Sequence, residues 1–174
     1  PRLLSLRSDE EKTKYLSDLF KMTYVKDIVE RHNLRGNVVI ESLIDVLASS
    51  VGSLSNPTKI AQPLLPTASD KTISSYIEYL EDSFLIRKAQ RYDIKGRKYI
   101  NSPFKYYFSD VGLRNARLNF RQQEPTHLME NIIYNELVAR GFSVDVGIVE
   151  HYVRTAGGKQ QTKQLEVDFV CNRG

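Results

Sequence analysis

Residues 69–94, "SDKTISSYIEYLEDSFLIRKAQRYDI", contain the point where the chain changes from helix to strand. In the first half, Ile73, Ile77 and Leu80 recur at spacings of three and four residues, which predicts a helix with one apolar face. The second half has the pattern of an extended chain, and Gly96 provides a tight turn into another extended segment, "RKYINS". A helix that leads directly into a β-hairpin predicts an α+β fold.

The elements before this stretch complete the order of a winged helix-turn-helix. The segment "VVIESLIDVLASSVG" (38–52) predicts a helix that ends at Gly52, and Asn56 followed by Pro57 predicts the start of a short helix. Helix, short helix, turn, helix and β-hairpin is the order of elements in a winged helix-turn-helix domain. After the hairpin, "PFKYYFSD" (103–110) predicts a third strand.

The pattern divides the chain into three parts. The first part reads as helix and begins with a capping box formed by Ser8 and Glu11. The polar stretch "NFRQQEPT" (119–126) predicts a domain boundary, and "THLMENIIYNELVARG" (126–141) then predicts a helix that is followed by two extended segments. We therefore expect a helical segment at 1–35, a winged-helix domain at 36–118 and an αβ domain at 119–174.

Composition excludes several classes of protein. A hydrophobic content of 41% with 26% charged residues is typical of a globular chain, and no run of about 18 apolar residues predicts a membrane span. The single cysteine, Cys171, excludes intrachain disulfides and fits a cytoplasmic location. The sequence has no phosphate loop and no nucleophile motif. Because the chain lacks an initiator methionine and stops just after a well-patterned strand, we expect a fragment of a longer protein.

Positive charge is concentrated in one part of the chain. Residues 87–105 hold seven lysines and arginines against one acid, Asp93, which predicts a polyanion such as DNA as partner. The helix 69–81 would then act as the recognition helix and the hairpin as a wing that contacts phosphates. The candidate DNA-binding residues are Lys71, Ser74, Ser75, Arg87, Arg91, Lys95, Arg97 and Lys98. The alternative is a winged helix that docks on a protein.

Acidic residues near the end of the chain suggest a second site. At 100° per residue, Glu130 lies about 20° from Leu137 around the helix axis, on the apolar face that must pack on the sheet. A carboxylate there needs a hydrogen bond, a cation or a metal. On the last strand, Leu165, Val167 and Phe169 alternate with Glu166 and Asp168, which predicts one apolar face and one acidic face.

Two interpretations of these acids remain open. Glu130 and Asp168, with Glu166 beside them, could share a divalent cation, and ligands that are all oxygen atoms suit Mg²⁺. Alternatively, Glu130 is satisfied by local backbone or by a lysine, and the acids of the strand face water.

Five segments together resemble the C-terminal half of a family of bacterial and archaeal AAA-type ATPases. They are "TYVKDIVERHNL" (23–34), "TISSYIEYLEDSFLIRKAQRYDIKGRK" (72–98), "KYYFSDVGLRNARL" (105–118), "HLMENIIYNELVARGFSVDVG" (127–147) and "QLEVDFV" (164–170). The resemblance implies that residues 1–35 are the tail of an ATPase module and that ATP binds only in an N-terminal core outside this sequence. It also implies that residues 119–174 begin a PD-(D/E)xK nuclease-like, restriction-endonuclease-like αβ domain, which is truncated here.

The resemblance assigns roles to the two acids. Glu130 matches the glutamate of the first core helix of such nucleases and Asp168 matches the aspartate of the second core strand, so both are candidate catalytic residues and Mg²⁺ ligands. The third motif has no counterpart in this chain, and we expect this fragment to be inactive alone.

The predicted function is the DNA-binding C-terminal region of an AAA-type ATPase, with DNA and the ATPase core of the same protein as partners. The alternative function is a protein-interaction module that docks the ATPase on a partner, without nucleic-acid binding or catalysis.

Overall fold

The structure, a computed structural model, describes residues 2–34, 38–64, 68–121, 124–154 and 160–173. The helices are α1 (Arg2–Ser5), α2 (Asp9–Leu19), α3 (Lys26–Arg31), α4 (Val38–Ser49), α5 (Pro57–Ala61), α6 (Asp70–Asp82), α7 (Val111–Arg117) and α8 (Pro125–Ala139). The strands are β1 (Ile86–Asp93), β2 (Lys98–Phe108), β3 (Ser143–Arg154) and β4 (Gln160–Asn172). A π-helical segment, Phe20–Val25, joins α2 to α3, and a 3₁₀ turn, Gln62–Leu64, follows α5. The α+β class predicted from the sequence is confirmed.

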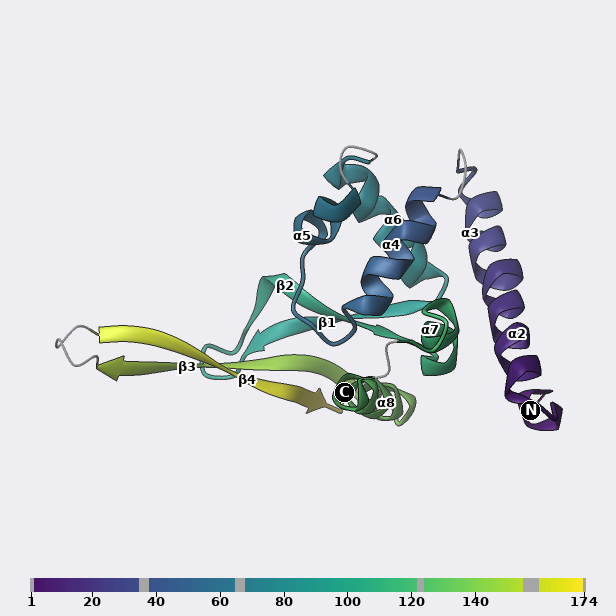
Figure 1. The fold of residues 1–174 in the computed structure, drawn as a ribbon. Coiled ribbons are helices and arrows are strands. Elements are labelled where there is room, and N and C mark those ends of the chain that lie inside the picture. Colours follow the sequence, from purple (N-terminus) through teal and green to yellow (C-terminus); the bar gives the residue numbers. More distant parts are fainter. Residues whose placement is uncertain (1, 35–37, 65–67, 122–123, 155–159, 174) are drawn as a thin grey trace.

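The four strands form one mixed sheet in the order β2-β1-β3-β4. Two antiparallel hairpins, β1–β2 and β3–β4, are joined by a short parallel pairing in which Arg91–Asp93 of β1 lie beside Val146–Ile148 of β3. This order places β4 at an edge of the sheet. Strands β3 and β4 extend well past the ends of β1 and β2 and form a projecting arm (Figure 1).

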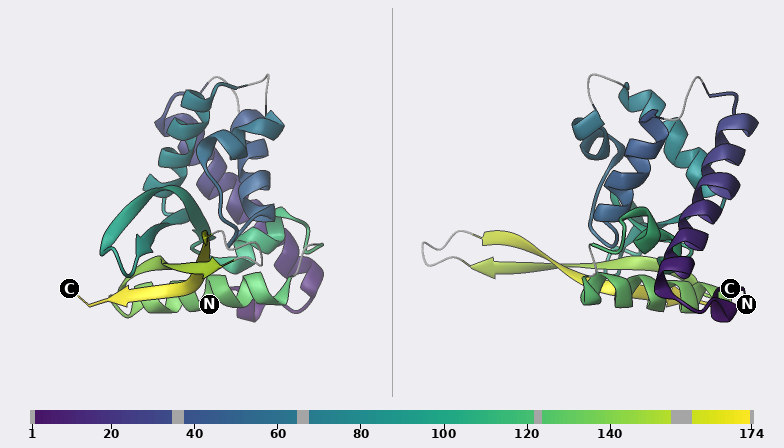
Figure 2. Two further views of the ribbon diagram at one scale, coloured as in Figure 1. Left: turned by 90° about the vertical axis from the view of Figure 1, so that its left-hand side faces the viewer. Right: turned by 45° about the vertical axis from the view of Figure 1, so that its right-hand side comes forward.

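Helices cover the two faces of the sheet unequally. Helices α4, α5 and α6 stand above the sheet, whereas α8 runs along the opposite face (Figures 1 and 2). The apolar face predicted for α6 is confirmed, because Ile73, Ile77 and Leu80 are all buried. The core between α4, α6 and the sheet also contains Leu43, Ile44, Leu47, Ile86, Tyr106 and Phe108.

Helix caps form where the sequence predicts them. The Ser8 hydroxyl accepts a hydrogen bond from the backbone N–H of Glu11, and the Glu11 carboxylate accepts one from the backbone N–H of Ser8, which completes the capping box. Asn56 caps α5 in the same way through the N–H of Lys59, with Pro57 at the first helical position.

The hairpin β1–β2 differs from the prediction in one respect. The segments "RKYINS" and "PFKYYFSD" do not form two strands but one, β2. Ala89 of β1 pairs with Lys105, whereas Arg91 pairs with Ile100, so extra residues of β2 are accommodated opposite Gln90. Because this irregularity absorbs the additional length, the strand continues through Pro103 instead of ending there.

A buried polar contact fastens α8 to the sheet. The side chain of Asn131, which is 1% exposed, accepts a hydrogen bond from the N–H of Phe108 at 2.9 Å and donates one to the carbonyl of Phe108 at 2.7 Å. The rings of Tyr134 and Tyr107 stack beside it at a centroid distance of 4.2 Å. Helix α8 is therefore positioned on the end of β2 by both hydrogen bonds and ring packing.

In the part of the chain that the structure describes, no helix has the length and the apolar character needed to cross a bilayer.

We expect Asn131→Ala to lower the free energy of unfolding by about 2 kcal/mol, because the N–H of Phe108 then remains buried without an acceptor. Urea denaturation checks this value. Thr126→Ala is the control, because Thr126 lies exposed in the first turn of the same helix and its removal should change the free energy by less than about 0.5 kcal/mol. Equal effects of the two substitutions would contradict the anchoring role of Asn131.

Candidate functional site

A lysine ammonium joins the two glutamates that the sequence analysis singled out. Nζ of Lys105 lies 2.8 Å from Oε1 of Glu130 on α8 and 2.7 Å from Oε1 of Glu166 on β4. The Lys105 side chain is only 5% exposed, and Glu130 and Glu166 are 14% and 33% exposed. The hydroxyl of Tyr107 donates to the same Oε1 of Glu130 at 2.5 Å. We call Lys105, Tyr107, Glu130 and Glu166 the lysine cluster.

The surroundings of the cluster stabilise the protonated forms of Lys105 and Tyr107. Burial by itself lowers the pKa of Lys105, but the hydrogen bonds to Glu130 and Glu166 outweigh it, and the pKa of the ammonium is raised. Burial and the hydrogen bond to Glu130 raise the pKa of Tyr107 far above its usual value. Tyr107 is therefore a neutral hydrogen-bond donor and Lys105 a charged one.

Glu130 thus takes a lysine as its partner, which is the second of the two interpretations that the sequence left open. Among the described residues, no group of three or more histidines, cysteines, aspartates and glutamates is arranged to hold a metal ion. The Lys105 ammonium lies between the carboxylates of Glu130 and Glu166 and supplies the positive charge that Mg²⁺ would otherwise supply. A catalytic or Mg²⁺-binding role of Glu130 and Asp168 stays a prediction.

The predicted alternation along β4 is wrong at its C-terminal end. Asp145 pairs with Val170 but Gly147 pairs with Val167, so Asp168 and Phe169 together oppose one residue of β3 in a β-bulge. The ring of Phe169 consequently lies 6.4 Å from those of Tyr107 and Tyr134, on the α8 side of the sheet. Glu166 faces that side too, through its contact with Lys105. Asp168 is exposed.

The predicted DNA-binding residues lie in different parts of the molecule. Three of them belong to α6, namely Lys71, which is exposed, and Ser74 and Ser75, which are partly buried. Four others are exposed on the first hairpin, namely Arg87, Lys95, Arg97 and Lys98. Nζ of Lys95 donates to the backbone carbonyl of Glu150 on β3 at 3.1 Å and so ties the turn to the projecting arm.

Arg91 is not on the surface of the wing. It is 7% exposed, and Nη2 donates to Oε1 of Gln164 on β4 at 2.9 Å. Its Nε is buried and has no hydrogen-bond partner, and among the described residues no carboxylate forms an ion pair with this guanidinium. Gln164 in turn donates to Glu150 at 3.3 Å. The structure thus contains a buried positive charge whose direct partner is a neutral amide on the edge strand.

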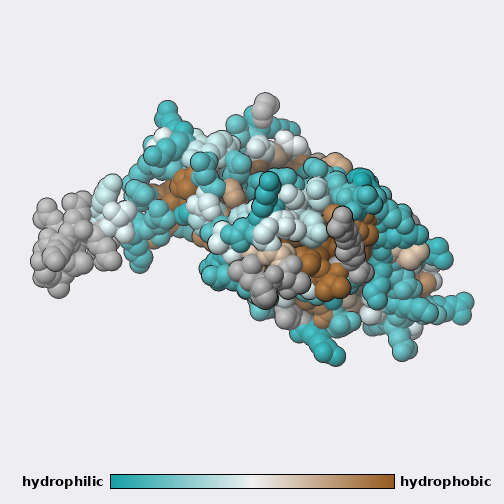
Figure 3. Space-filling model, turned by 90° about the horizontal axis from the view of Figure 1, so that it is seen from above, coloured by the Kyte–Doolittle hydropathy of each residue, from teal (hydrophilic) through white to brown (hydrophobic). Residues whose placement is uncertain are grey.

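An exposed apolar patch lies at the base of the projecting arm, on the face opposite α8. We define the open face as Ile94, Tyr99, Leu165 and Val167, which are 38%, 54%, 45% and 42% exposed. These side chains lie away from α8, because Leu165 and Val167 alternate with Glu166. Figure 3 looks onto this side of the molecule and shows hydrophobic surface near the base of the arm.

Gly147 allows neighbouring side chains of the open face to pack closely over the backbone of β3. A Cβ atom at this position would lie 2.9 Å from Cδ1 of Ile94 and 3.0 Å from Cβ of Val167. The side chains of two neighbouring strands therefore close over the glycine backbone. The hydroxyl of Tyr99 donates to Asp145 at 3.0 Å and holds its ring at the border of this face.

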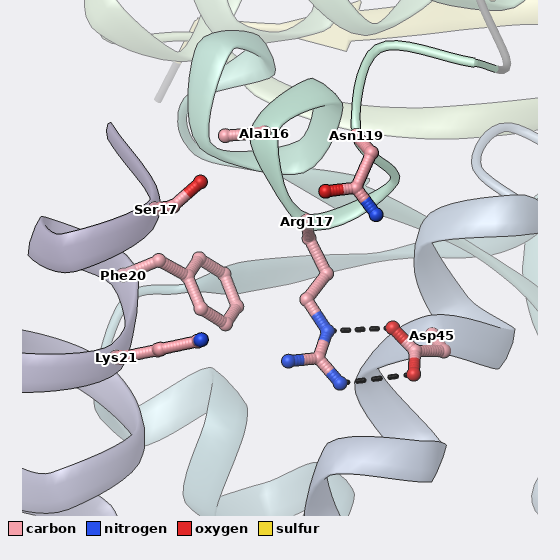
Figure 4. Close-up of a pocket in the computed structure, with 7 residues that line it drawn as sticks. All are labelled: Ser17, Phe20, Lys21, Asp45, Ala116, Arg117 and Asn119. Atoms are coloured by element: carbon pink, nitrogen blue, oxygen red, sulfur yellow. Dashed lines mark hydrogen bonds and ion pairs between the residues drawn. The ribbon is translucent and has the colours of Figure 1, made fainter. Parts of the chain in front are cut away.

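A separate cavity of about 300 Å³ lies between α2, α4 and α7 (Figure 4). Its most prominent group is Arg117, whose guanidinium is held by Asp45 at 2.5 and 2.9 Å and by Glu41 at 3.2 Å, and lies 5.9 Å from the centre of the Phe20 ring. Two carboxylates already neutralise this cation, so the cavity does not offer an anion-binding site. The ion pairs of Arg117 instead connect α7 to α4.

The sequence analysis missed the central residues of the lysine cluster and the partner of Arg91. Lys105 was counted with the basic run, and Tyr107 and Gln164 were not singled out. The usable signal was the position of Lys105 within the apolar and aromatic segment "FKYYF", where an ammonium needs a buried acid.

We expect Lys105→Met to lower the free energy of unfolding by about 3–5 kcal/mol, because Glu130 and Glu166 lose the charge that neutralises them. The triple variant with Glu130→Gln and Glu166→Gln should recover most of the loss. The control is Arg140→Met, which removes the exposed ion pair between Glu136 of α8 and the C-cap residue Arg140 and should cost less than about 1 kcal/mol. A Lys105→Met protein as stable as the parent would contradict the role of the cluster.

The cluster also predicts a pH dependence. Because the pKa values of Lys105 and Tyr107 are raised in the folded state, their contributions are complete below about pH 10, the ordinary range of both groups, and are lost as the pH rises through the folded pKa values. Urea denaturation between neutral and alkaline pH should show a steeper alkaline loss for the parent than for the double variant Lys105→Met/Tyr107→Phe. Parallel curves would contradict this assignment.

The chain matches two longer relatives that are both described as uncharacterized proteins. One, from Haemophilus influenzae, is 39% identical over 166 residues, which are 93% of this chain and 38% of the relative. The other, from Methanocaldococcus jannaschii, is 27% identical over 173 residues, which are 98% of this chain and 36% of the relative. The chain therefore spans little more than a third of the length of these relatives. No solved structure matches the chain.

These comparisons correct the assignment made from the sequence motifs. A family model described as "Domain of unknown function (DUF8612)" matches residues 1–124, and neither relative carries a name that indicates an ATPase, a nuclease or a DNA-binding protein. The predicted identity as the C-terminal half of an AAA-type ATPase is wrong, and the DNA-binding and nuclease functions inferred with it lose their basis. The chain belongs to the DUF8612 family, whose function is unknown.

Proposed function

We propose that this domain binds polypeptides, and that it does so by accepting an extended segment as an additional strand beside β4. The observation that carries the proposal is the position of β4, which pairs with β3 along one side and is the last strand of the sheet on the other. An edge strand presents unpaired backbone N–H and C=O groups that a further strand can satisfy.

The length of the edge supports this function. Strand β4 has 13 residues, which is about 40 Å of extended chain. It lies on an arm that projects away from the helices, so the approach of another segment is not obstructed by α4, α5 or α6 (Figure 1). Natural sheets commonly protect edges of this length by covering or shortening them, and neither device is present on the described part of β4.

The side chains of the edge supply the chemistry of the bound segment. On the open face, Leu165 and Val167 expose apolar surface, so we propose an occupant with apolar residues at every second position. On the other face, the exposed parts of Glu166 and Gln164, which keep their partners within the chain, can contact polar side chains of the occupant. Backbone pairing would supply affinity and these alternating contacts would supply selectivity.

The remaining part of the chain fits the role of a support. We propose that α4, α5, α6 and the hairpin β1–β2 form a winged helix that serves as a scaffold for the arm. Its wing contacts the arm through Lys95 and the carbonyl of Glu150, and through Arg91 and Gln164. In this arrangement the wing positions β3 and β4.

The test uses the immobilised domain and a phage-displayed library of random peptides about 12 residues long, a length that matches one strand. We expect enrichment of peptides with alternating apolar residues, and at least a tenfold loss of their binding to the double variant Leu165→Lys/Val167→Lys. Met22→Lys is the matched control, because Met22 is 64% exposed but lies in the π-helical segment far from the arm.

Circular dichroism would verify that the variants are folded. Enriched peptides that bind the Leu165→Lys/Val167→Lys variant as well as the parent would contradict the proposed site, and a library without any enriched peptide would contradict the proposed function.

A further inference from the structure

We infer that the segment which β4 accepts is β4 of a second copy of this chain, so that two domains join their sheets around a two-fold axis at Leu165. The inference rests on the proposed strand addition and names its occupant. It is carried by the unsatisfied charge of Arg91 and by the order of residues along β4.

The environment of Arg91 indicates that the partner supplies a carboxylate. Arg91 is 7% exposed as a residue, its Nε is buried without a hydrogen-bond partner, and its described contact is a single hydrogen bond from Nη2 to Oε1 of Gln164. A buried charge without an acid is costly, and the penalty falls if a carboxylate approaches the guanidinium. Glu150 of the same chain accepts a hydrogen bond from Gln164, but no described ion pair joins it to Arg91. Because Gln164 lies on the edge strand, the residue of an added strand that stands opposite Gln164 is a position from which a further carboxylate can approach.

The sequence of β4 itself places a carboxylate there. In an antiparallel pair centred on Leu165, Leu165 faces Leu165 of the second copy and Gln164 faces its Glu166. Residues directly opposite each other point to the same face of a sheet, with Cβ atoms about 5 Å apart. Glu166 of each copy then lies on the α8 side of the sheet beside Gln164 of the other copy, which is the hydrogen-bond partner of Arg91. The two-fold symmetry produces this contact twice.

Other features of the strand agree with this register. Glu166 is held by Lys105 but keeps 33% of its side chain exposed, so it can accept a second cationic partner. On the open face, the apolar side chains of Leu165 from both copies meet at the axis, and Val167 of each copy covers the aliphatic part of Lys163 of the other. Such a self-complementary patch is what an isologous interface requires.

The first measurement is the association state of the intact chain by sedimentation equilibrium between about 1 and 100 μM, a range that covers ordinary self-association constants. We expect a reversible dimer. Arg91→Met should raise the dissociation constant at least tenfold, because it removes the positive charge that holds Gln164 and attracts Glu166 of the second copy. Arg140→Met, which removes an arginine of an exposed pair on α8, should leave the constant unchanged.

The second measurement fixes the register by disulfide formation, in a background in which Cys171→Ser removes the native thiol. Residues at the axis have Cα atoms about 5 Å apart, which suits a disulfide. Leu165→Cys should therefore form covalent dimers on mild oxidation. In the same register the two Cα atoms of residue 167 are about 14 Å apart, so Val167→Cys should not crosslink.

The outcomes separate the two proposals. A monomer at every concentration, equal dissociation constants for the parent and Arg91→Met, or crosslinking at residue 167 in place of residue 165 would each overturn the second copy as occupant. If the chain is monomeric but library peptides bind in a manner that requires Leu165 and Val167, strand addition stands and only the choice of occupant fails. If neither event occurs, both proposals fail.

Discussion

The structure depends on one ammonium group. The side chain of Lys105 projects from β2, is buried under α8, and contacts one carboxylate from α8 and another from β4. Three elements that are distant in the sequence are thereby held together at a single point, with Tyr107 as an additional donor to Glu130. An ion network of this kind adds less stability than its Coulomb energy suggests, because all its members lose water. The network instead favours one packing of α8 and β4 on the sheet, because any other placement of these elements leaves a buried charge without a partner.

The local elements were predictable because their signals are local. The spacing of Ile73, Ile77 and Leu80 identifies α6, and the capping box of Ser8 and Glu11 identifies the start of α2, since both depend on residues within one or two turns. The extended pattern after α6 likewise identifies β1. These features required no knowledge of what packs against them.

Features that depend on strand pairing could not be predicted in the same way. The extra residues of β2 opposite Gln90 and the bulge at Asp168 and Phe169 exist only in relation to a neighbouring strand. Dependence on distant elements also explains why the burial of two cations was not predicted. Lys105 and Arg91 look like solvated cations in the sequence, and they are buried because α8 and β4 bring Glu130, Glu166 and Gln164 over them. Family-like motifs did not resolve this, because similar segments support different activities on similar scaffolds.

The short parallel pairing in the middle of the sheet has a consequence for the order of assembly. Each hairpin joins residues that are close in sequence, whereas the contact between Arg91–Asp93 and Val146–Ile148 requires a loop of more than fifty residues to close. Loop-closure entropy therefore favours formation of each hairpin before the seam between them. The sheet is continuous in its final form, but the contact that makes it continuous is the one with the largest entropic cost.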